Sequence, residues 1–177
     1  AEALSMADRI VVLSEGRILQ AGTPREIYQR PVSPVVALQL GQPAINLLPV
    51  KRRGGHWTTP DGTALLPAAA QGSDERLLGI RPEDLLPEVP GAGASTPSPI
   101  DAASTPVAVV EIVEYIGPTT TLLCAWAGSR VHVIIPRRGA LRPGDRIHLR
   151  LDPARVVLFD AALPPSPASF NSPSSLP

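Results

Sequence analysis

Short runs of alternating apolar and polar residues dominate this chain from Leu47 onward. Such runs, each the length of one β-strand and bounded by glycine and proline turn signals, cover residues 107–116, 119–126, 131–135, 146–151 and 156–159. In the run 146–151 every second residue is apolar, so Ile147 and Leu149 would face a core while Arg146 and Arg150 face solvent. The pattern predicts a mainly β fold built as a small antiparallel barrel.

The first part of the chain has a different pattern, that of a β-hairpin. Two β-branched or apolar runs at residues 10–13 and 17–21 are joined by Ser14-Glu15-Gly16. Glycine in that position allows the positive φ that a tight hairpin turn requires. We therefore expect a strand, a turn and a second strand before residue 22.

Two short helices should follow the hairpin. Thr23 and Glu26 have the spacing of a capping box, with a proline in the first helical turn. Ser33 repeats the same start signal for residues 35–40, and Gly41 supplies a C-terminal stop. The sequence thus predicts two short helices between the hairpin and the β-rich part.

Composition excludes several classes of function. The 16 basic and 16 acidic residues cancel, and there are only six aromatic residues (two each of Phe, Trp and Tyr), so nucleic acid is a poor candidate partner. The single cysteine, Cys124, cannot form an internal disulfide, and neither a leader-like segment nor an apolar run of about 20 residues is present. These features favour a cytoplasmic setting with only indirect membrane association.

The residues give no support for catalysis by this chain. A Gly-x-x-x-x-Gly-Lys-Ser/Thr phosphate loop, an apolar strand ending in Asp-Glu for magnesium, and the common hydrolase motifs are all missing. His56, His132 and His148 lack metal-site spacing and are expected at the surface, whereas Cys124 is expected in the core. We expect no catalytic, cofactor or metal site in this sequence.

Three motifs, in order along the chain, resemble the ATP-binding subunits of ABC importers. Residues 1–24 resemble the segment that follows the switch histidine of the ATPase domain. Residues 41–49, with the pattern Gly-x-Pro-x-x-Asn-x-Leu, resemble the junction to the C-terminal domain in the carbohydrate group (maltose or glycerol-phosphate type). The stretch 77–86 resembles the Gly-x-Arg-Pro-Glu element of the TOBE domain, an OB-type regulatory barrel, and residues 149–157 weakly repeat its layout, which hints at two related half-barrels.

The resemblance implies a division of the chain into parts. Residues 1–45 would be the end of a nucleotide-binding domain, with the hairpin, two short helices and a hinge at Gly41 and Pro43. Residues 46–160 would be an OB-like, TOBE-type barrel. It would carry a flexible insert at 88–106, rich in Pro, Gly, Ala, Ser and Thr. Residues 161–177 would be a disordered tail.

The resemblance also implies a function and its partners. The chain would be the regulatory and dimerisation region of an importer subunit for sugars or glycerol-phosphate-like solutes, on the inner face of the plasma membrane. ATP and magnesium would bind elsewhere in the intact subunit. Partners would be a second copy, the permease subunits, and a regulatory protein or small ligand. Interface or barrel-locking roles fall to four residues: Asn46, Arg81, Pro82 and Glu83.

Other interpretations stay open at this point. A free-standing OB-type module that binds a small ligand or oxyanion would need basic residues, and Lys51-Arg52-Arg53 and Arg137-Arg138 with Arg142 are candidates, although solvated turns suit them better. For Arg81, Pro82 and Glu83, a purely structural corner with a local ion pair is an equal alternative. A nucleic-acid-binding OB barrel is disfavoured because aromatic stacking residues are scarce.

Overall fold

The computed structural model describes residues 7–88, 106–136 and 141–160. Regular structure in these ranges is mostly β-strand. The strands are β1 (Ile10–Ser14), β2 (Arg17–Gly22), β3 (Asn46–Arg53), β4 (His56–Thr58), β5 (Ala64–Pro67), β6 (Glu75–Ile80), β7 (Leu85–Glu88), β8 (Val107–Ile116), β9 (Thr119–Trp126), β10 (Ser129–Pro136), β11 (Arg146–Leu151) and β12 (Val157–Asp160). The helices are α2 (Pro24–Gln29), α3 (Pro34–Gln39) and the 3₁₀ turns η1 (Pro82–Asp84) and η2 (Pro153–Arg155).

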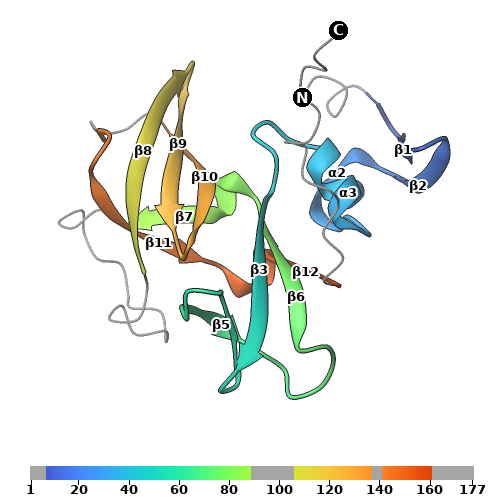
Figure 1. The fold of residues 1–177 in the computed structure, drawn as a ribbon. Helices are drawn as coiled ribbons and strands as arrows, with labels where there is room; N and C mark the ends of the chain where they lie inside the picture. Colours follow the sequence, from blue (N-terminus) through green and yellow to red (C-terminus); the bar gives the residue numbers. More distant parts are fainter. Residues whose placement is uncertain (1–6, 89–105, 137–140, 161–177) are drawn as a thin grey trace, which may run out of the picture.

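The strands form three antiparallel sheets (Figure 1). β1 and β2 make a separate two-stranded hairpin, as the sequence predicted. The other strands form two five-stranded sheets, with the orders β10-β9-β8-β11-β7 and β12-β6-β3-β4-β5. Both sheets contribute to one apolar core, with Leu48 and Leu78 from one and Leu122 and Val131 from the other. The predicted mainly β, antiparallel architecture is therefore confirmed, with its strands divided over two sheets.

Two proline corners connect the sheets. At Pro82 the chain leaves β6 in one sheet, makes η1, and enters β7 in the other sheet. At Pro153 it crosses in the opposite sense, from β11 through η2 to β12. β7 pairs with β11 and β12 pairs with β6, so the corners are related to each other like two halves of one motif. The weak sequence repeat at residues 149–157 corresponds to this arrangement.

The N-terminal helices follow from their caps. The Thr23 hydroxyl accepts from the Glu26 backbone N–H, and the Glu26 carboxylate accepts from the Thr23 N–H, which completes the predicted capping box. This contact lowers the pKa of the Glu26 carboxyl. The Ser33 hydroxyl caps α3 in the same way, accepting from Val36. Both helices therefore begin at the residues that the sequence predicted.

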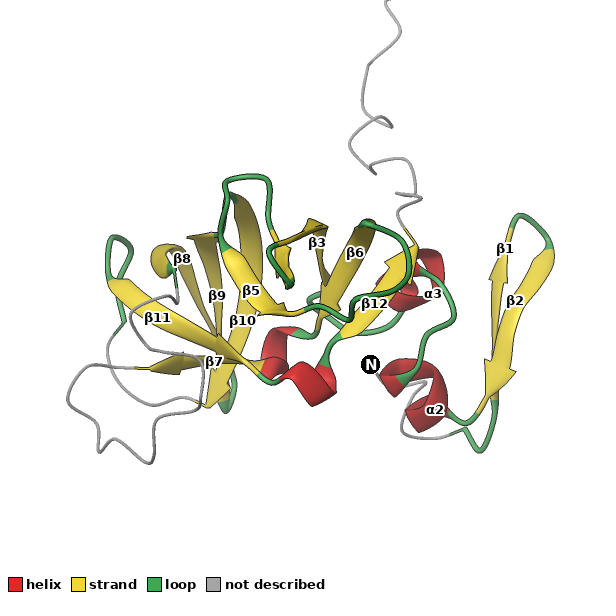
Figure 2. Ribbon diagram, turned by 90° about the horizontal axis from the view of Figure 1, so that it is seen from below, coloured by secondary structure: helices red, strands yellow, loops and turns green. Residues whose placement is uncertain are grey.

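Helix α3 lies between the hairpin and the sheets, as Figure 2 shows. Val36 on one side of the helix packs in a cluster with Val12 and Ile27. Ala37 on another side packs with Ile45, Leu77 and Phe159. Two different faces of one short helix are thus buried against two different parts of the chain. Helix α3 thus contributes to both clusters, one shared with the hairpin and one shared with the sheets.

The Gly79 of the Gly-x-Arg-Pro-Glu element has a packing role. A Cβ at this position would lie 2.9 Å from the Phe159 ring and 3.0 Å from the Ile45 side chain. Any larger residue would push these two side chains out of the cluster beneath α3. Glycine at 79 therefore lets β12 and the residue before β3 approach β6 closely.

Several predicted strands match the structure. The runs at 107–116, 119–126 and 146–151 coincide with β8, β9 and β11, and Ile147 and Leu149 are buried as expected. β10 extends beyond the predicted 131–135, and β12 is shifted by one residue from the predicted 156–159. Nearly all of the predicted insert and the whole predicted tail lie outside the described residues.

Candidate functional site

Arg81 is the centre of a junction between the sheets and the helices. It follows β6 directly and is only 5% exposed. Its Nη1 donates to the carbonyls of Ala37 at 3.2 Å and Leu40 at 2.6 Å, and its Nη2 donates to the Tyr28 carbonyl at 2.9 Å. These carbonyls lie at the C-terminal ends of α2 and α3, where no intrahelical donor is left for them. The Arg81 side chain, which follows β6, thus donates hydrogen bonds to the carbonyls at the C-terminal ends of both helices.

Tyr28 completes the contact from the helical side. The Arg81 guanidinium carbon lies 3.8 Å from the centre of the Tyr28 ring, a cation–π contact. The Tyr28 hydroxyl donates to Glu83 Oε1 at 2.6 Å. Burial, with a further contribution from this hydrogen bond, raises the pKa of Tyr28, so the hydroxyl stays a donor. We call Tyr28, Arg81 and Glu83 the junction cluster.

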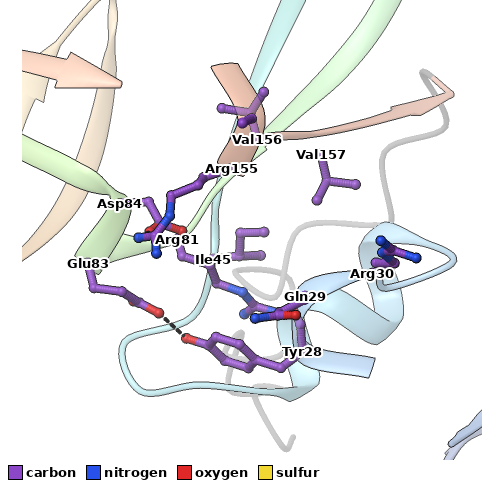
Figure 3. A pocket seen from close by; sticks show the side chains of 11 residues that line it. Tyr28, Gln29, Arg30, Ile45, Arg81, Glu83, Asp84, Arg155, Val156 and Val157 are labelled. Carbon is purple, nitrogen blue, oxygen red and sulfur yellow. Dashed lines mark hydrogen bonds and ion pairs between the residues drawn. The ribbon is translucent and has the colours of Figure 1, made fainter. Parts of the chain in front are cut away.

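The junction cluster lines a cleft of about 410 Å³, shown in Figure 3. The cleft lies between α2 and the two proline corners, and Arg155 of one corner forms an ion pair with Asp84 of the other at 2.5 Å. Burial raises the pKa of Asp84, and the Arg155 charge partly offsets this effect. The buried Pro82 precedes Glu83 and Asp84, so it fixes the backbone at the start of the corner. The cleft is lined by side chains of both charges and by the apolar residues Ile45 and Val157.

The predicted hinge residues lie beside the junction cluster. Gly41 has φ +100°, and a Cβ there would meet the Pro43 carbonyl and the Tyr28 ring, each at 3.3 Å, and the Arg81 guanidinium at 3.4 Å. The Gln42-Pro43 peptide bond is cis. The contacts around Gly41 show that this segment is packed against Tyr28 and Arg81 of the junction cluster.

Asn46 lies apart from the junction cluster. It is 6% exposed and its side chain forms two hydrogen bonds with the backbone of His132. These bonds join β3 of one sheet to β10 of the other. Of the four site residues predicted from sequence, the structure brings together Arg81, Pro82 and Glu83 and places Asn46 elsewhere. Tyr28 was not predicted, and nothing in its local sequence indicates the contact.

The polar side chains at this site form hydrogen bonds and ion pairs within the chain. The described residues include no group of three or more His, Cys, Asp or Glu side chains placed to hold a metal ion. Cys124 is fully buried, and burial raises the pKa of its thiol to about 11, far from what a nucleophile needs. No helix within the described ranges is long and apolar enough to cross a membrane. His132 and His148, predicted at the surface, are half-buried.

Two of the three basic residues near position 52, Lys51 and Arg52, are already paired. Lys51 Nζ lies 2.6 Å from Glu75 Oε1, and Arg52 is bound to Asp74 and to the carbonyls of Ala69 and Gly72. Arg137 and Arg138 lie outside the described residues. Lys51 and Arg52 are therefore engaged in contacts within the chain and offer little capacity for an oxyanion.

Comparison with known proteins shows what this chain is similar to. The sequence profile of the TOBE domain family matches residues 78–159, which span both proline corners. The chain is 37% identical over 163 residues to the sn-glycerol-3-phosphate import ATP-binding protein of Chromohalobacter salexigens, covering 90% of this chain and 42% of that protein. The protein of the same name from Jannaschia sp. is 38% identical over 161 residues, with the same coverage.

Two further comparisons complete the picture. An uncharacterized ABC transporter ATP-binding protein of Sinorhizobium fredii is 36% identical over 165 residues, covering 90% of this chain and 41% of that protein. The cytoplasmic molybdate-binding protein ModG is similar in structure at a TM-score of 0.49 and 13% identity, covering 65% of this chain and 95% of ModG. The chain spans about two fifths of the length of the curated relatives it matches. It contains a TOBE domain at residues 78–159, and over 90% of its length it is similar to the C-terminal region of ABC import ATP-binding proteins.

Proposed function

We propose that this chain is the regulatory and dimerisation region of the ATP-binding subunit of an ABC importer. The solute would be a sugar or a glycerol-phosphate-like compound. The observation that carries the proposal is the 37% identity, over 90% of this chain, to a glycerol-3-phosphate import ATP-binding protein. ATP and magnesium would bind to residues outside this chain, which itself would hydrolyse no ATP.

The proposed roles are divided between the two parts of the chain that meet at the junction cluster. Residues 1–45 would belong to the nucleotide-binding domain and residues 46–160 to the regulatory domain. Permease subunits would contact the former, and a second copy, with any regulatory protein or small ligand, would contact the latter. The whole subunit would lie on the cytoplasmic face of the membrane.

The proposed role of the site residues is mechanical. Arg81 and Glu83 are supported as interface residues by their contacts with Tyr28 and with the ends of α2 and α3. Asn46 is supported as a barrel-locking residue by its two hydrogen bonds to His132. Gly41 and Pro43 would form the connection whose conformation the junction cluster controls. A movement of the helices would then reach the sheets through these contacts.

Three experiments test the proposed function. The DNA upstream of the Ala1 codon should encode, in frame, a phosphate loop, a signature loop and the switch histidine; a start codon and ribosome-binding site there would contradict the proposal. The 177-residue chain should release no phosphate from ATP in a colorimetric assay. Molybdate or phosphate should not raise the melting temperature of the chain, as they would for a free-standing oxyanion binder.

A further inference from the structure

The cleft beside the junction cluster carries more positive than negative charge. Its lining includes three arginines and two carboxylates: Arg30, Arg81, Arg155, Glu83 and Asp84. Both carboxylates already have a donor. Glu83 accepts from the Tyr28 hydroxyl, and Asp84 pairs with Arg155. The excess charge of the cleft is therefore positive.

Arg81, the most buried of the three arginines, has no carboxylate in direct contact. Its hydrogen bonds go to three neutral carbonyls, and its guanidinium stacks on the Tyr28 ring. Its Nε is buried without a hydrogen-bond partner. In the part of the chain that the structure describes, no ion pair involves Arg81. Burial lowers the pKa of Arg81, and Glu83 and Asp84 offset this only from a distance. A buried charge without a direct counter-charge is costly, so an anion in the adjoining cleft would stabilise it.

Arg30 and Arg155 present exposed guanidinium groups to the same cleft, as Figure 3 shows. The Arg155 side chain is 63% exposed and uses Nη1 for its ion pair with Asp84, which leaves its other donors for a ligand. The Arg30 side chain forms no ion pair with a described residue. Glu26, one helical turn before Arg30, is engaged in the capping box with Thr23. Both arginines can therefore donate charge-assisted hydrogen bonds to an anion.

Apolar side chains line another part of the cleft. Ile45, Val156 and Val157 contribute to it together with Ala154. The volume of about 410 Å³ lies within the range of small-molecule sites. Each methylene group that a ligand buries against such side chains strengthens its binding. The lining therefore favours an anion that carries a carbon chain over an inorganic ion.

We propose that this cleft binds a small organic anion, a carboxylate or a phosphate ester on a short carbon chain. The acidic head would face Arg30 and Arg155, and the carbon chain would lie on Ile45 and Val157. The inference names the chemical class of the small ligand in the proposed function and rests on that function for its biological role. Because α2 and the two proline corners belong to different parts of the chain, the bound anion would hold these parts together.

An NMR titration of the 177-residue chain tests the ligand class. Butyl phosphate and pentanoate carry the two acidic heads on the same butyl chain, and butan-1-ol is their neutral analogue. At least one of the two anions should shift the backbone amide signals of residues 30, 83–84 and 155–157, and the tighter one identifies the head. Inorganic phosphate should bind at least about tenfold more weakly, since each buried methylene contributes a factor of about four. Shifts confined to other residues, or equal binding of butan-1-ol, would overturn the proposal.

A pair of variants on α2 and its C-cap tests the site. Arg30→Gln removes one positive charge of the cleft and should weaken binding of the tighter anion about tenfold. Arg25→Gln is the matched control, because Arg25 is also exposed but does not line the cleft, and it should leave the affinity unchanged. Circular dichroism should show both variants folded. An unchanged affinity in Arg30→Gln, or equal losses in the two variants, would refute the cleft as the anion site. The upstream sequence tests the proposed function separately.

Discussion

The side-chain amide of Asn46 pairs with the backbone of His132 in the way that a neighbouring strand would. Asn46 Nδ2 donates to the His132 carbonyl at 2.8 Å, and Asn46 Oδ1 accepts from the His132 N–H at 2.7 Å. β10 lies at the edge of its sheet, so these two backbone groups have no partner strand. The Asn46 amide thus joins the two sheets and also occupies part of an edge that would otherwise be open to pairing.

Replacing Asn46 by leucine should destabilise the chain more than its size change suggests. The substitution leaves the N–H and C=O of His132 unpaired in a half-buried place, which is expected to lower the free energy of unfolding by about 2–3 kcal/mol. Urea denaturation measures this. Lys51→Ala on the same strand, where the side chain is 58% exposed, is the control and should change it by less than about 1 kcal/mol. Equal effects of both variants would contradict the account of Asn46.

The Tyr28–Glu83 hydrogen bond should be measurable by a double-mutant cycle. Tyr28→Phe removes the hydroxyl that donates to Glu83 and keeps the ring that stacks on Arg81. Because the acceptor is a half-buried carboxylate, the loss is expected to be about 1–2 kcal/mol. With Glu83→Leu already present, Tyr28→Phe should cost much less. Additive losses in the cycle would show that the two residues are not coupled.

Gly41 should tolerate substitution less well than another glycine with positive φ. Gly41→Ala combines a left-handed backbone with contacts at 3.3 Å to Tyr28 and Pro43, so a loss of about 2–3 kcal/mol is expected. Gly54→Ala has φ +55° with nothing within 4 Å of the new Cβ, and should cost about 1 kcal/mol. Thermal denaturation of the two variants compares them. A smaller effect at Gly41 would mean that the segment is not packed as described.

Local signals in the sequence predicted the parts that local physics determines. The Thr23 capping box, the Ser33 cap and the Gly16 turn depend on residues within three or four positions of one another, and the structure has each of them. The clean alternation at residues 146–151 likewise predicted which side of β11 is buried. Short-range hydrogen bonding and strand periodicity leave a direct record in the sequence.

Long-range relationships left no such record. Arg81 was predicted as an interface or locking residue, but its partner Tyr28 is 53 residues away in sequence and was missed. The passage of the chain from one sheet to the other at Pro82 and at Pro153 was visible in the sequence only as a weak repeat, because chain order does not reveal which sheet a strand joins. The side-chain pairing of Asn46 with His132 spans 86 residues. Such contacts depend on the packing of the whole fold.

The pH dependence of Cys124 chemistry should reflect its burial. Burial raises the pKa of the thiol to about 11, so the thiol of the folded chain stays protonated at pH 8.5. The stability that the buried, protonated thiol contributes is lost as the pH rises through this folded-state pKa. Alkylation by iodoacetamide at pH 8.5 should be at least about a hundredfold slower for the folded chain than for the urea-unfolded chain. Similar rates in both states would contradict a fully buried thiol.

Arg81 couples the two helices to the sheets, and native-state hydrogen exchange of the Arg81→Ala variant tests this coupling most directly. In the wild type, the buried amides of α2 and α3 should open together with those of β6, since one side chain binds the ends of both helices. Loss of Arg81 leaves three carbonyls without their donor. The helices of the variant should therefore exchange by a separate, lower-energy opening while β9 keeps its protection. Unchanged, common protection of helices and sheets in Arg81→Ala, or separate openings already in the wild type, would contradict the claim that this residue couples them.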